Sequence, residues 1–410
     1  MDGLTYKGIP LGIELDAEAL GSGRLSVSGG DLATPVATLN LPAVQANAAA
    51  MHDYCTAHGV QLAPHAKTTL AAGLLEVQRQ HGVWAMTAAL PRQVALLWRL
   101  GFDRVLLANE VTDPAALRWL ADQLAGDDRR ELYLYVDSAA GVELLAQLAP
   151  ARPFQVLVEL GYAGGRTGCR SSAEALALAE LVAATDGVRL AGVAGYEGTI
   201  GAVREPQVLS AVDAFLTGLR ELADELIAAG LLTAADTVLS AGGSVFFDRV
   251  VELLGGWGRE SGATVVLRSG CYLIHDHGLY AAGTPAAAQV PGAPRFSAAL
   301  SVWARVVSTP EPGLALADAG RRDLSHDAGL PVPLQRVRGS DVIELAGAGA
   351  QVEALSDQHV FVRYPDSLDV RPGDLIRLGI SHPCTTLDRH RALFLVDDSN
   401  QVIGVVETEF

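Results

Sequence analysis

The sequence predicts an α/β fold: a TIM (β/α)8 barrel followed by a C-terminal all-β domain. In the first part of the chain, eight short apolar runs alternate with Ala- and Leu-rich segments. This alternation predicts parallel βαβ units, and eight such units make a TIM barrel. After about Ala282, the stretch TPAAAQVPGAP leads into strand-like runs with turn signals and no long helical period. A doubly wound open sheet is the alternative architecture for the first part.

The expected elements follow in chain order. Residues 1–33 form a polar lead-in, 34–285 the barrel and 286–410 the β domain. An amphipathic helix is expected over 41–58, and Asp113-Pro114 and Ser171-Ser172 are typical helix starts. Barrel strands are expected near 60–66, 84–88, 104–109, 132–137, 154–160, 189–196, 237–242 and 264–269. Strands of the β domain are expected near 297–307, 314–318, 341–346, 359–363, 374–378, 392–396 and 402–407.

Composition excludes several classes of function. The net charge of −17 argues against nucleic acid and anionic membrane surfaces as partners. Four scattered cysteines are too few for a disulfide scaffold, and we see neither a signal peptide nor a membrane-spanning run, so we expect a cytoplasmic protein. A local anion site remains compatible with this charge, because one lysine or a few backbone amides can hold a phosphate.

Two motifs at the ends of barrel strands could carry chemistry. PHAKTT places Lys67 at the carboxyl end of the first strand, where TIM-barrel catalysis occurs and where a lysine can form a Schiff base. Position alone favours an ordinary solvated lysine at a strand end. After the fifth strand, the Gly-rich loop 159–168 carries Arg166, whose fixed charge could bind a phenolate or carboxylate. A flexible surface loop is the alternative there.

Three further loops complete this edge of the barrel. Tyr196 ends the sixth strand and could pack on a flat cofactor, although buried tyrosines at strand ends usually belong to the core. Gly242, Gly243 and Ser244 follow the seventh strand, and Gly270, Cys271 and Tyr272 follow the eighth. Loops after strands seven and eight form the recurrent phosphate site of TIM barrels. Their coincidence with these small residues predicts an anion site.

The β domain contains one candidate metal pair. His382 and Cys384 offer an imidazole nitrogen and a thiolate sulfur to zinc, but two ligands are too few for a closed structural site. Spacing alone favours a buried cysteine beside a surface histidine. His275-Asp276-His277 is a weaker rival, and the polar segments 318–320 and 325–327 are either entrance residues or plain turns.

These motifs together resemble the fold-type III pyridoxal-phosphate (PLP) enzymes, the alanine-racemase-like group. The branch that is most similar contains D-serine dehydratases, D-threonine aldolases and amino acid deaminases. The matching stretches are PHAKTT, GGRTG, GYEG, SAGGS, RSGCY, DAGRRDLSHDAGLP and SHPCTT, which run from about residue 34 to the C-terminus. PHAKT and the His-x-Cys motif are the specific ones.

The resemblance implies a role for each candidate. Lys67 would hold PLP covalently as a Schiff base, Arg166 would approach the phenolic oxygen, and Tyr196 would lie near the ring. The segments Gly242–Ser244 and Gly270–Tyr272 would hold the phosphate, and His382 with Cys384 would bind zinc near the substrate β-hydroxyl. The resemblance also implies a β domain closed off by residues 1–33 and a homodimer with shared active sites. Of the four cysteines, only Cys384 is expected to take part in chemistry.

The expected activity is elimination of water from a β-hydroxy-D-amino acid such as D-serine, giving a 2-oxo acid and ammonia. In the similar branch, His-x-Cys is typical of the dehydratases and His-x-Asp of the aldolases, and a thiolate suits zinc better than magnesium or manganese. Alternatives are a D-threonine aldolase, a racemase, and a PLP-carrying protein with little turnover. Glu197, which follows Tyr196, has no role that the sequence defines.

Overall fold

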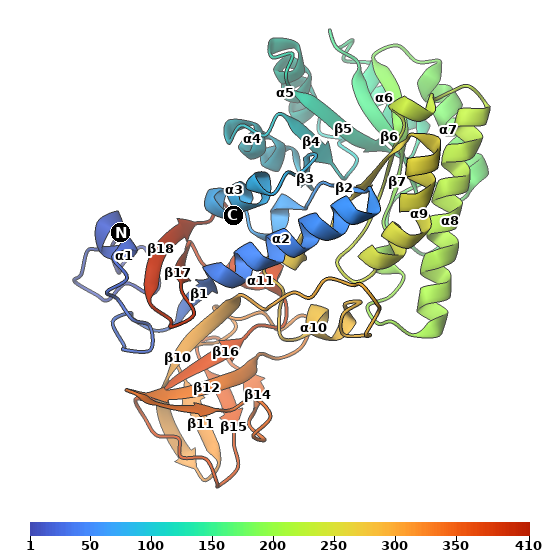
Figure 1. The fold of residues 1–410 in the computed structure, drawn as a ribbon. Coiled ribbons are helices and arrows are strands. Elements are labelled where there is room, and N and C mark those ends of the chain that lie inside the picture. Colours follow the sequence, from blue (N-terminus) through green and yellow to red (C-terminus); the bar gives the residue numbers. More distant parts are fainter.

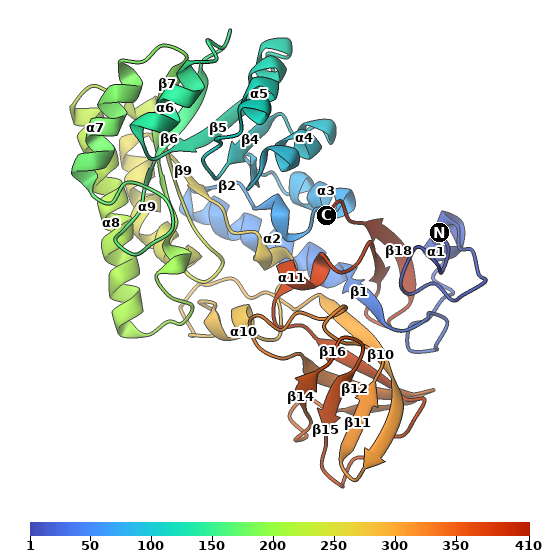
Figure 2. The ribbon, with the colours of Figure 1, turned by 180° about the vertical axis from the view of Figure 1, so that it is seen from behind.

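The fold is described from a computed structural model, which covers the backbone of residues 1–410 and every side chain except that of Ala17. A helix-wrapped parallel sheet forms one body, and a mostly antiparallel β domain packs beside it (Figure 1). The N-terminal segment lies beside β17 and β18 at one side of the β domain, and α11 (Pro383–Leu387) lies between the two bodies (Figures 1 and 2).

The first body is an eight-stranded, all-parallel sheet curled into a barrel, which confirms the predicted fold class. Its strand order is β2-β9-β8-β7-β6-β5-β4-β3. The gap between β3 and β2 is bridged by a parallel pairing of His65 with Thr87 and by a 2.9 Å hydrogen bond from Thr87 N to Pro64 O. The strands are β2 (Gln61–Leu62), β3 (Met86–Ala88), β4 (Arg104–Leu107), β5 (Glu131–Val136), β6 (Phe154–Leu160), β7 (Val188–Gly195), β8 (Val238–Ala241) and β9 (Thr264–Leu267).

The helices between these strands start where the sequence places caps. Asp113 accepts a hydrogen bond from Ala115 N at the start of α5, and Ser171 accepts one from Glu174 N at the start of α7. The outer helices are α2 (Leu41–His58), α3 (Ala72–Gln80), α4 (Pro91–Arg99), α5 (Pro114–Gly126), α6 (Ala139–Ala146), α7 (Ser172–Ala183), α8 (Pro206–Ala228), α9 (Phe247–Ser261) and α10 (Leu279–Gly283). Short 3-10 turns cover Ala66–Thr68, Glu197–Thr199, Ala234–Asp236 and Cys271–Leu273.

The β domain is built on a ten-stranded sheet that includes one strand from the start of the chain. Its strands are β1 (Val36–Asn40), β10 (Leu300–Glu311), β11 (Leu314–Ala317), β12 (Val332–Arg338), β13 (Asp341–Glu344), β14 (Gln351–Leu355), β15 (Val360–Arg363), β16 (Leu375–Gly379), β17 (Ala392–Val396) and β18 (Val402–Glu407). Strand β1 pairs with β10 and β17. It therefore belongs to this sheet, although the sequence assigned residues from 34 onward to the barrel.

The misplaced boundary has a local cause. Asn40 is both the last residue of β1 and the N-cap of α2, where its side chain accepts a hydrogen bond from Ala43 N. A strand that runs without a loop into the first barrel helix gives no sequence signal of a domain change. Strands β12 and β14 were not expected, because their mixed polar residues and Pro333 hide any alternation.

The N-terminal segment packs on the β domain. The Lys7 ammonium contacts Asp323 Oδ1 at 2.7 Å, and Ser26 pairs with Gln401 in an isolated bridge. Helix α1 (Ala17–Gly21) begins at Asp16, whose carboxylate accepts a hydrogen bond from Ala19 N.

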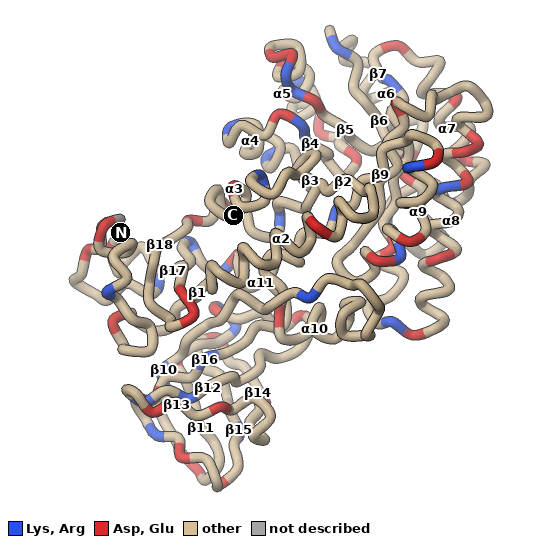
Figure 3. The backbone as a smooth tube through the Cα atoms, in the orientation of Figure 1, with Lys and Arg blue, Asp and Glu red and all other residues tan. Residues whose placement is uncertain are grey.

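Acidic and basic residues are interspersed along the outer helices α7, α8 and α9 (Figure 3). Within the described residues, no helix combines the length and apolarity that crossing a bilayer requires.

Candidate active site

A cavity of about 520 Å³ opens at the carboxyl ends of the barrel strands and is lined by residues of both domains. Every sequence-predicted site residue except Tyr272 contributes to its wall. From the barrel these are Lys67, Arg166, Tyr196, Gly242, Gly243, Ser244 and Gly270, and from the β domain they are His382 and Cys384. The loops after five different strands (β2, β6, β7, β8 and β9) thus converge with α11 on one space, as TIM-barrel sites do.

Lys67 lies in the 3-10 turn that follows β2, and its side chain is exposed to the cavity. The sequence contains only two lysines, Lys7 and Lys67. The Lys7 ammonium is held by Asp323 and by the carbonyl oxygens of Arg322 and Arg389. Among the residues that line this cavity, Lys67 is therefore the one whose side-chain amine can form a Schiff base.

Two arginines line one wall of the cavity: Arg166, whose guanidinium lies over the Tyr196 ring, and the buried Arg268. The Arg166 guanidinium lies 5.2 Å from the centre of the Tyr196 ring. Burial raises the pKa of Tyr196 to about 12, so its hydroxyl is protonated at neutral pH. Arg268, 2% exposed at the end of β9, donates to Ser240 Oγ and Gly195 O at 2.6 Å each, and its Nε has no partner among the described atoms.

The glycine loop after β8 requires its small residues. Gly242 has φ of +115°, and a Cβ there would collide with the Leu267 side chain. The amides of Gly242 and Gly243 donate to the Glu197 carboxylate at 3.1 and 2.6 Å. Glu197 is fully buried and does not line the cavity. The carboxylate therefore braces the loop from behind, and the N–H groups predicted to hold a phosphate at these two glycines are engaged here by Glu197.

The side chain of Tyr272 does not line the cavity, so the prediction that Gly270–Tyr272 holds a phosphate can apply at this position only to the backbone amide. Tyr272 is 3% exposed, its hydroxyl accepts a hydrogen bond from Gln78 Nε2 at 3.2 Å, and its ring packs 5.8 Å from that of Phe296. The turn at 271–273 directs successive side chains to opposite sides. Cys271 consequently faces the cavity and Tyr272 faces the core.

Cys271 was expected to be structural, but it lies beside the predicted metal ligand. Its Sγ is 3.5 Å from Cys384 Sγ, and both are free thiols. The Thr68 hydroxyl lies 3.7 Å from the Cys271 sulfur and 3.6 Å from the Cys384 sulfur. The hydrogen bond from Cys384 lowers the pKa of Cys271 to about 6 and raises that of Cys384.

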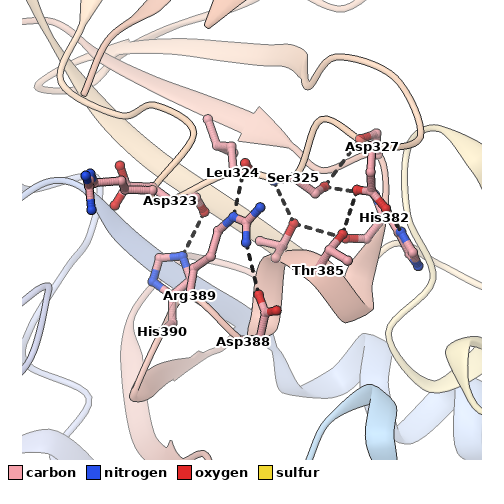
Figure 4. A network of polar contacts seen from close by, with 12 residues as sticks. Asp323, Leu324, Ser325, Asp327, His382, Thr385, Asp388, Arg389 and His390 are labelled. Atoms are coloured by element: carbon pink, nitrogen blue, oxygen red, sulfur yellow. Dashed lines mark hydrogen bonds and ion pairs between the residues drawn. The ribbon is translucent and has the colours of Figure 1, made fainter. Parts of the chain in front are cut away.

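The imidazole of His382 is anchored on the β-domain side (Figure 4). Its Nδ1 lies 2.7 Å from Asp327 Oδ2, and the Thr385 hydroxyl donates to the other oxygen of Asp327. A ring that donates through Nδ1 keeps a free lone pair on Nε2, the usual arrangement of a metal-binding histidine. Asp327 therefore belongs to this network, whereas Asp318 accepts from Arg305 N and Thr34 Oγ1 elsewhere. Among the described side chains, no three His, Cys, Asp or Glu residues are already clustered as metal ligands.

The rival motif 275–277 serves the protein scaffold. Asp276 accepts hydrogen bonds from the amides of Gly278, Tyr280 and Ala281, which caps α10. His275 and His277 are outside the cavity wall. Burial lowers the pKa of His277 to about 4, so the ring is neutral.

Several lining residues were not singled out from the sequence: His65, Asn109, Tyr135, Arg268 and Tyr280. His65 and Arg268 lie inside motifs that the sequence did highlight, PHAKTT and RSGCY. An arginine at the end of a buried barrel strand was the available signal. Tyr135 and Tyr280 look like ordinary core residues in sequence, so nothing distinguished them.

The polar atoms of the cavity fit PLP. His65 Nδ1, the Tyr135 hydroxyl and Arg268 Nε belong to residues of the cavity wall and have no partner among the described atoms, so they are free to hydrogen-bond a bound group. The Lys67 amine could bind an aldehyde, the Arg166 cation a phenolate, and the two loops that contain Ser244 and Gly270 a phosphate. The neighbouring sulfur and imidazole donors fit zinc by chemical type.

Comparison with known proteins gives the same grouping. The family model "Alanine racemase, N-terminal domain" matches residues 39–247, and "Putative serine dehydratase domain" matches residues 299–396. D-threonine aldolase of Arthrobacter sp. is 28% identical over 91% of this chain and 90% of its own. D-threo-3-hydroxyaspartate dehydratase of Delftia sp. (strain HT23) is 27% identical over 87% and 92%. The crystal structure of D-threonine aldolase from Filomicrobium marinum superposes with a TM-score of 0.79 at 26% identity, covering 94% of this chain and 97% of that one.

The first of these matches spans half of the chain and coincides with the barrel that carries Lys67, and the second coincides with the β domain that carries His382 and Cys384. The chain therefore belongs to the alanine racemase N-terminal domain family and is a fold-type III PLP enzyme of the lyase type.

Proposed function

We propose that this protein is a zinc-dependent dehydratase of β-hydroxy-D-amino acids, with D-serine or a close relative as substrate. The observation that carries the proposal is the position of Lys67, the one cavity lysine, in the same space as His382 and Cys384. A base for Cα and a donor pair for a metal are thereby offered to the same small substrate. The match of the β domain to the serine dehydratase model supports elimination.

Each residue has a defined part in this proposal. PLP bound at Lys67 supplies an electron sink for charge at the substrate Cα. The amine of Lys67, when free, would accept the α-proton of the substrate. Zinc at His382 and Cys384 supplies a Lewis acid for the β-hydroxyl. Arg166 offers its fixed charge to a phenolate, and the braced loop 242–244 fixes one end of the site. Overall, one water leaves the substrate and one hydrolyses the product enamine, giving a 2-oxo acid and ammonia.

A second candidate is retro-aldol cleavage to glycine and an aldehyde, favoured by the similarity to the D-threonine aldolases. Both reactions use the same scaffold, and the bond broken distinguishes them. Elimination breaks Cβ–O, whereas aldol cleavage removes a proton from the β-hydroxyl and breaks Cα–Cβ.

The test is product identification with purified protein and D-serine, D-threonine, D-threo-3-hydroxyaspartate and their L-forms, with and without zinc. We expect pyruvate from D-serine and 2-oxobutanoate from D-threonine. Acetaldehyde with glycine would instead establish the aldolase, and solvent deuterium at an inverted Cα without cleavage would establish a racemase.

The cofactor assignment has its own test. Lys67→Ala should abolish the visible Schiff-base absorbance, while the matched control Lys7→Arg should retain it. Because the chain has no third lysine, Schiff-base absorbance that persists in Lys67→Ala would overturn the assignment. No Schiff-base absorbance in the wild type loaded with PLP would defeat the cofactor assignment, and with it the dehydratase, aldolase, racemase and PLP-carrier hypotheses alike.

We further propose a homodimer in which the partner's β domain completes each site, as the family resemblance implies. Light scattering of the holoenzyme should give twice the chain mass of 42.8 kDa. A monomer with full activity would contradict shared sites.

A further inference from the structure

We propose that Cys271 is a third protein ligand of the zinc ion, which makes the site a Cys₂His centre with its fourth position open to substrate. This inference rests on the proposed zinc site of His382 and Cys384 and extends it with a residue of the barrel. The feature that leads to it is the pair of facing sulfurs at the boundary between the two domains.

The distance between the sulfurs is the first argument. Cys271 Sγ and Cys384 Sγ lie 3.5 Å apart. Two thiolates on one tetrahedral zinc, each bonded at about 2.3 Å, lie roughly 3.8 Å apart. A disulfide would need about 2.05 Å. The separation is therefore near that of two ligands of one ion.

Ligand number is the second argument. Catalytic zinc sites characteristically combine three protein ligands with one open position. His382 and Cys384 alone leave the set one short. Cys271 is the remaining Cys, Asp or Glu among the residues that line this cavity, so it is the available thiolate donor.

Charge and hydrogen bonding are the third argument. Two thiolates neutralise the double charge of zinc, which an enclosed site requires. Cys271 is 7% exposed, and the Thr68 hydroxyl stands beside both sulfurs as an outer hydrogen-bonding group. Asp327 fixes the imidazole of His382 from outside in the same way.

The sulfur pair also joins the two domains. Cys271 follows β9 in the barrel, and Cys384 lies on α11 in the β domain. Among the described residues, the imidazole of His382 and the two sulfurs do not form a cluster of three metal ligands. Under this proposal, zinc binding brings His382 and the two cysteines onto the same ion.

The experiment counts sulfurs on the metal in the holoenzyme. X-ray absorption at the zinc edge of the wild type should show two sulfur neighbours at about 2.3 Å. Replacement of zinc by cobalt(II) should give a thiolate-to-metal charge-transfer band in the near ultraviolet. That band should fall by about half in Cys271→Ser, and the zinc dissociation constant should rise roughly 100-fold or more, beyond the effect of losing an outer-shell group.

The controls separate this inference from the proposed function. Cys55→Ala, a buried cysteine of α2 outside the cavity, should change neither readout. One sulfur per zinc in the wild type, or a Cys271→Ser band of full intensity, overturns the role of Cys271 while leaving the His382–Cys384 site intact. A wild type that binds no zinc defeats the proposed function itself. If Cys271→Ser does not fold, the sulfur count in the wild type still decides.

Discussion

The loop 242–244, which we propose to hold the cofactor phosphate, depends on a carboxylate that does not reach the cavity, and this gives a sharp prediction for Glu197→Gln. In the structure, Glu197 accepts two amide hydrogen bonds from Gly242 and Gly243. A hydrogen bond to a charged acceptor contributes about 1.5–3 kcal/mol, and a buried donor left unpaired costs about 1–3 kcal/mol. A glutamine has one acceptor oxygen and must turn its NH₂ group toward the second amide.

We therefore expect Glu197→Gln to lower the free energy of unfolding by about 2 kcal/mol and Glu197→Ala by about 4 kcal/mol. If the lost energy falls on the loop position that binds the phosphate, the PLP dissociation constant should rise by up to about 30-fold in Glu197→Gln. Urea unfolding of the apoprotein and absorbance titration with PLP measure the two quantities. Glu205→Gln, an exposed glutamate at the start of α8, is the matched control.

Two results would refute this reasoning. Wild-type stability and PLP affinity in Glu197→Gln, within about 0.5 kcal/mol, would mean that the two hydrogen bonds do not position the loop. Tighter PLP binding in Glu197→Ala would mean that the carboxylate competes with the phosphate for the same amides.

Three further predictions test other parts of the site. Tyr272→Phe should leave the cofactor spectrum unchanged and cost about 1 kcal/mol in urea unfolding, because it removes only the hydrogen bond from Gln78; a lost spectrum would restore Tyr272 to the site. Burial, and after it repulsion from Glu159, raises the pKa of Glu110 from 4.5 to about 8. Between these two pH values the folded state keeps a proton on Glu110 that the unfolded state loses. The free energy of unfolding should therefore fall as pH rises from about 4.5 to about 8. Glu110→Gln should remove roughly 2 kcal/mol of that fall, less than full linkage because water reaches part of the side chain, and an unchanged pH profile of unfolding would contradict this. Asp327→Asn should weaken zinc binding 10–100-fold in competition with a chelator, and unaltered affinity would exclude a positioning role.

The sequence was sufficient for the barrel strands because each is a short apolar run that begins or ends within a few residues of its prediction. β6 at Phe154–Leu160 matches its predicted range, and α2 matches at both ends. It was insufficient where a residue's surroundings come from distant segments. Strand β1 pairs with strands more than 250 residues away, which no local pattern reveals.

The same reason explains the successes and failures in the site. Lys67 could be placed because the carboxyl end of a barrel strand is a functional position whatever the rest of the chain does. Tyr272 and Cys271 are neighbours in one turn, and only the turn geometry decides which of them faces the cavity. Glu197 was left without a role because its partners, two backbone amides, have no sequence signature.

The two domains contribute different groups to the cavity, and this difference bears on which reaction is catalysed. The barrel supplies Lys67, Arg166 and the loop proposed to hold the phosphate, groups that serve any reaction in which negative charge develops at Cα. The β domain supplies His382 and Cys384, and a metal held there would act on the substrate only if Cβ carries a group that a metal can bind, such as a hydroxyl. Elimination and aldol cleavage therefore diverge at the sulfur and imidazole donors rather than at the lysine. Exchange of Cys384 for aspartate is accordingly the substitution that should shift the product ratio most, while Lys67→Ala should abolish both reactions alike.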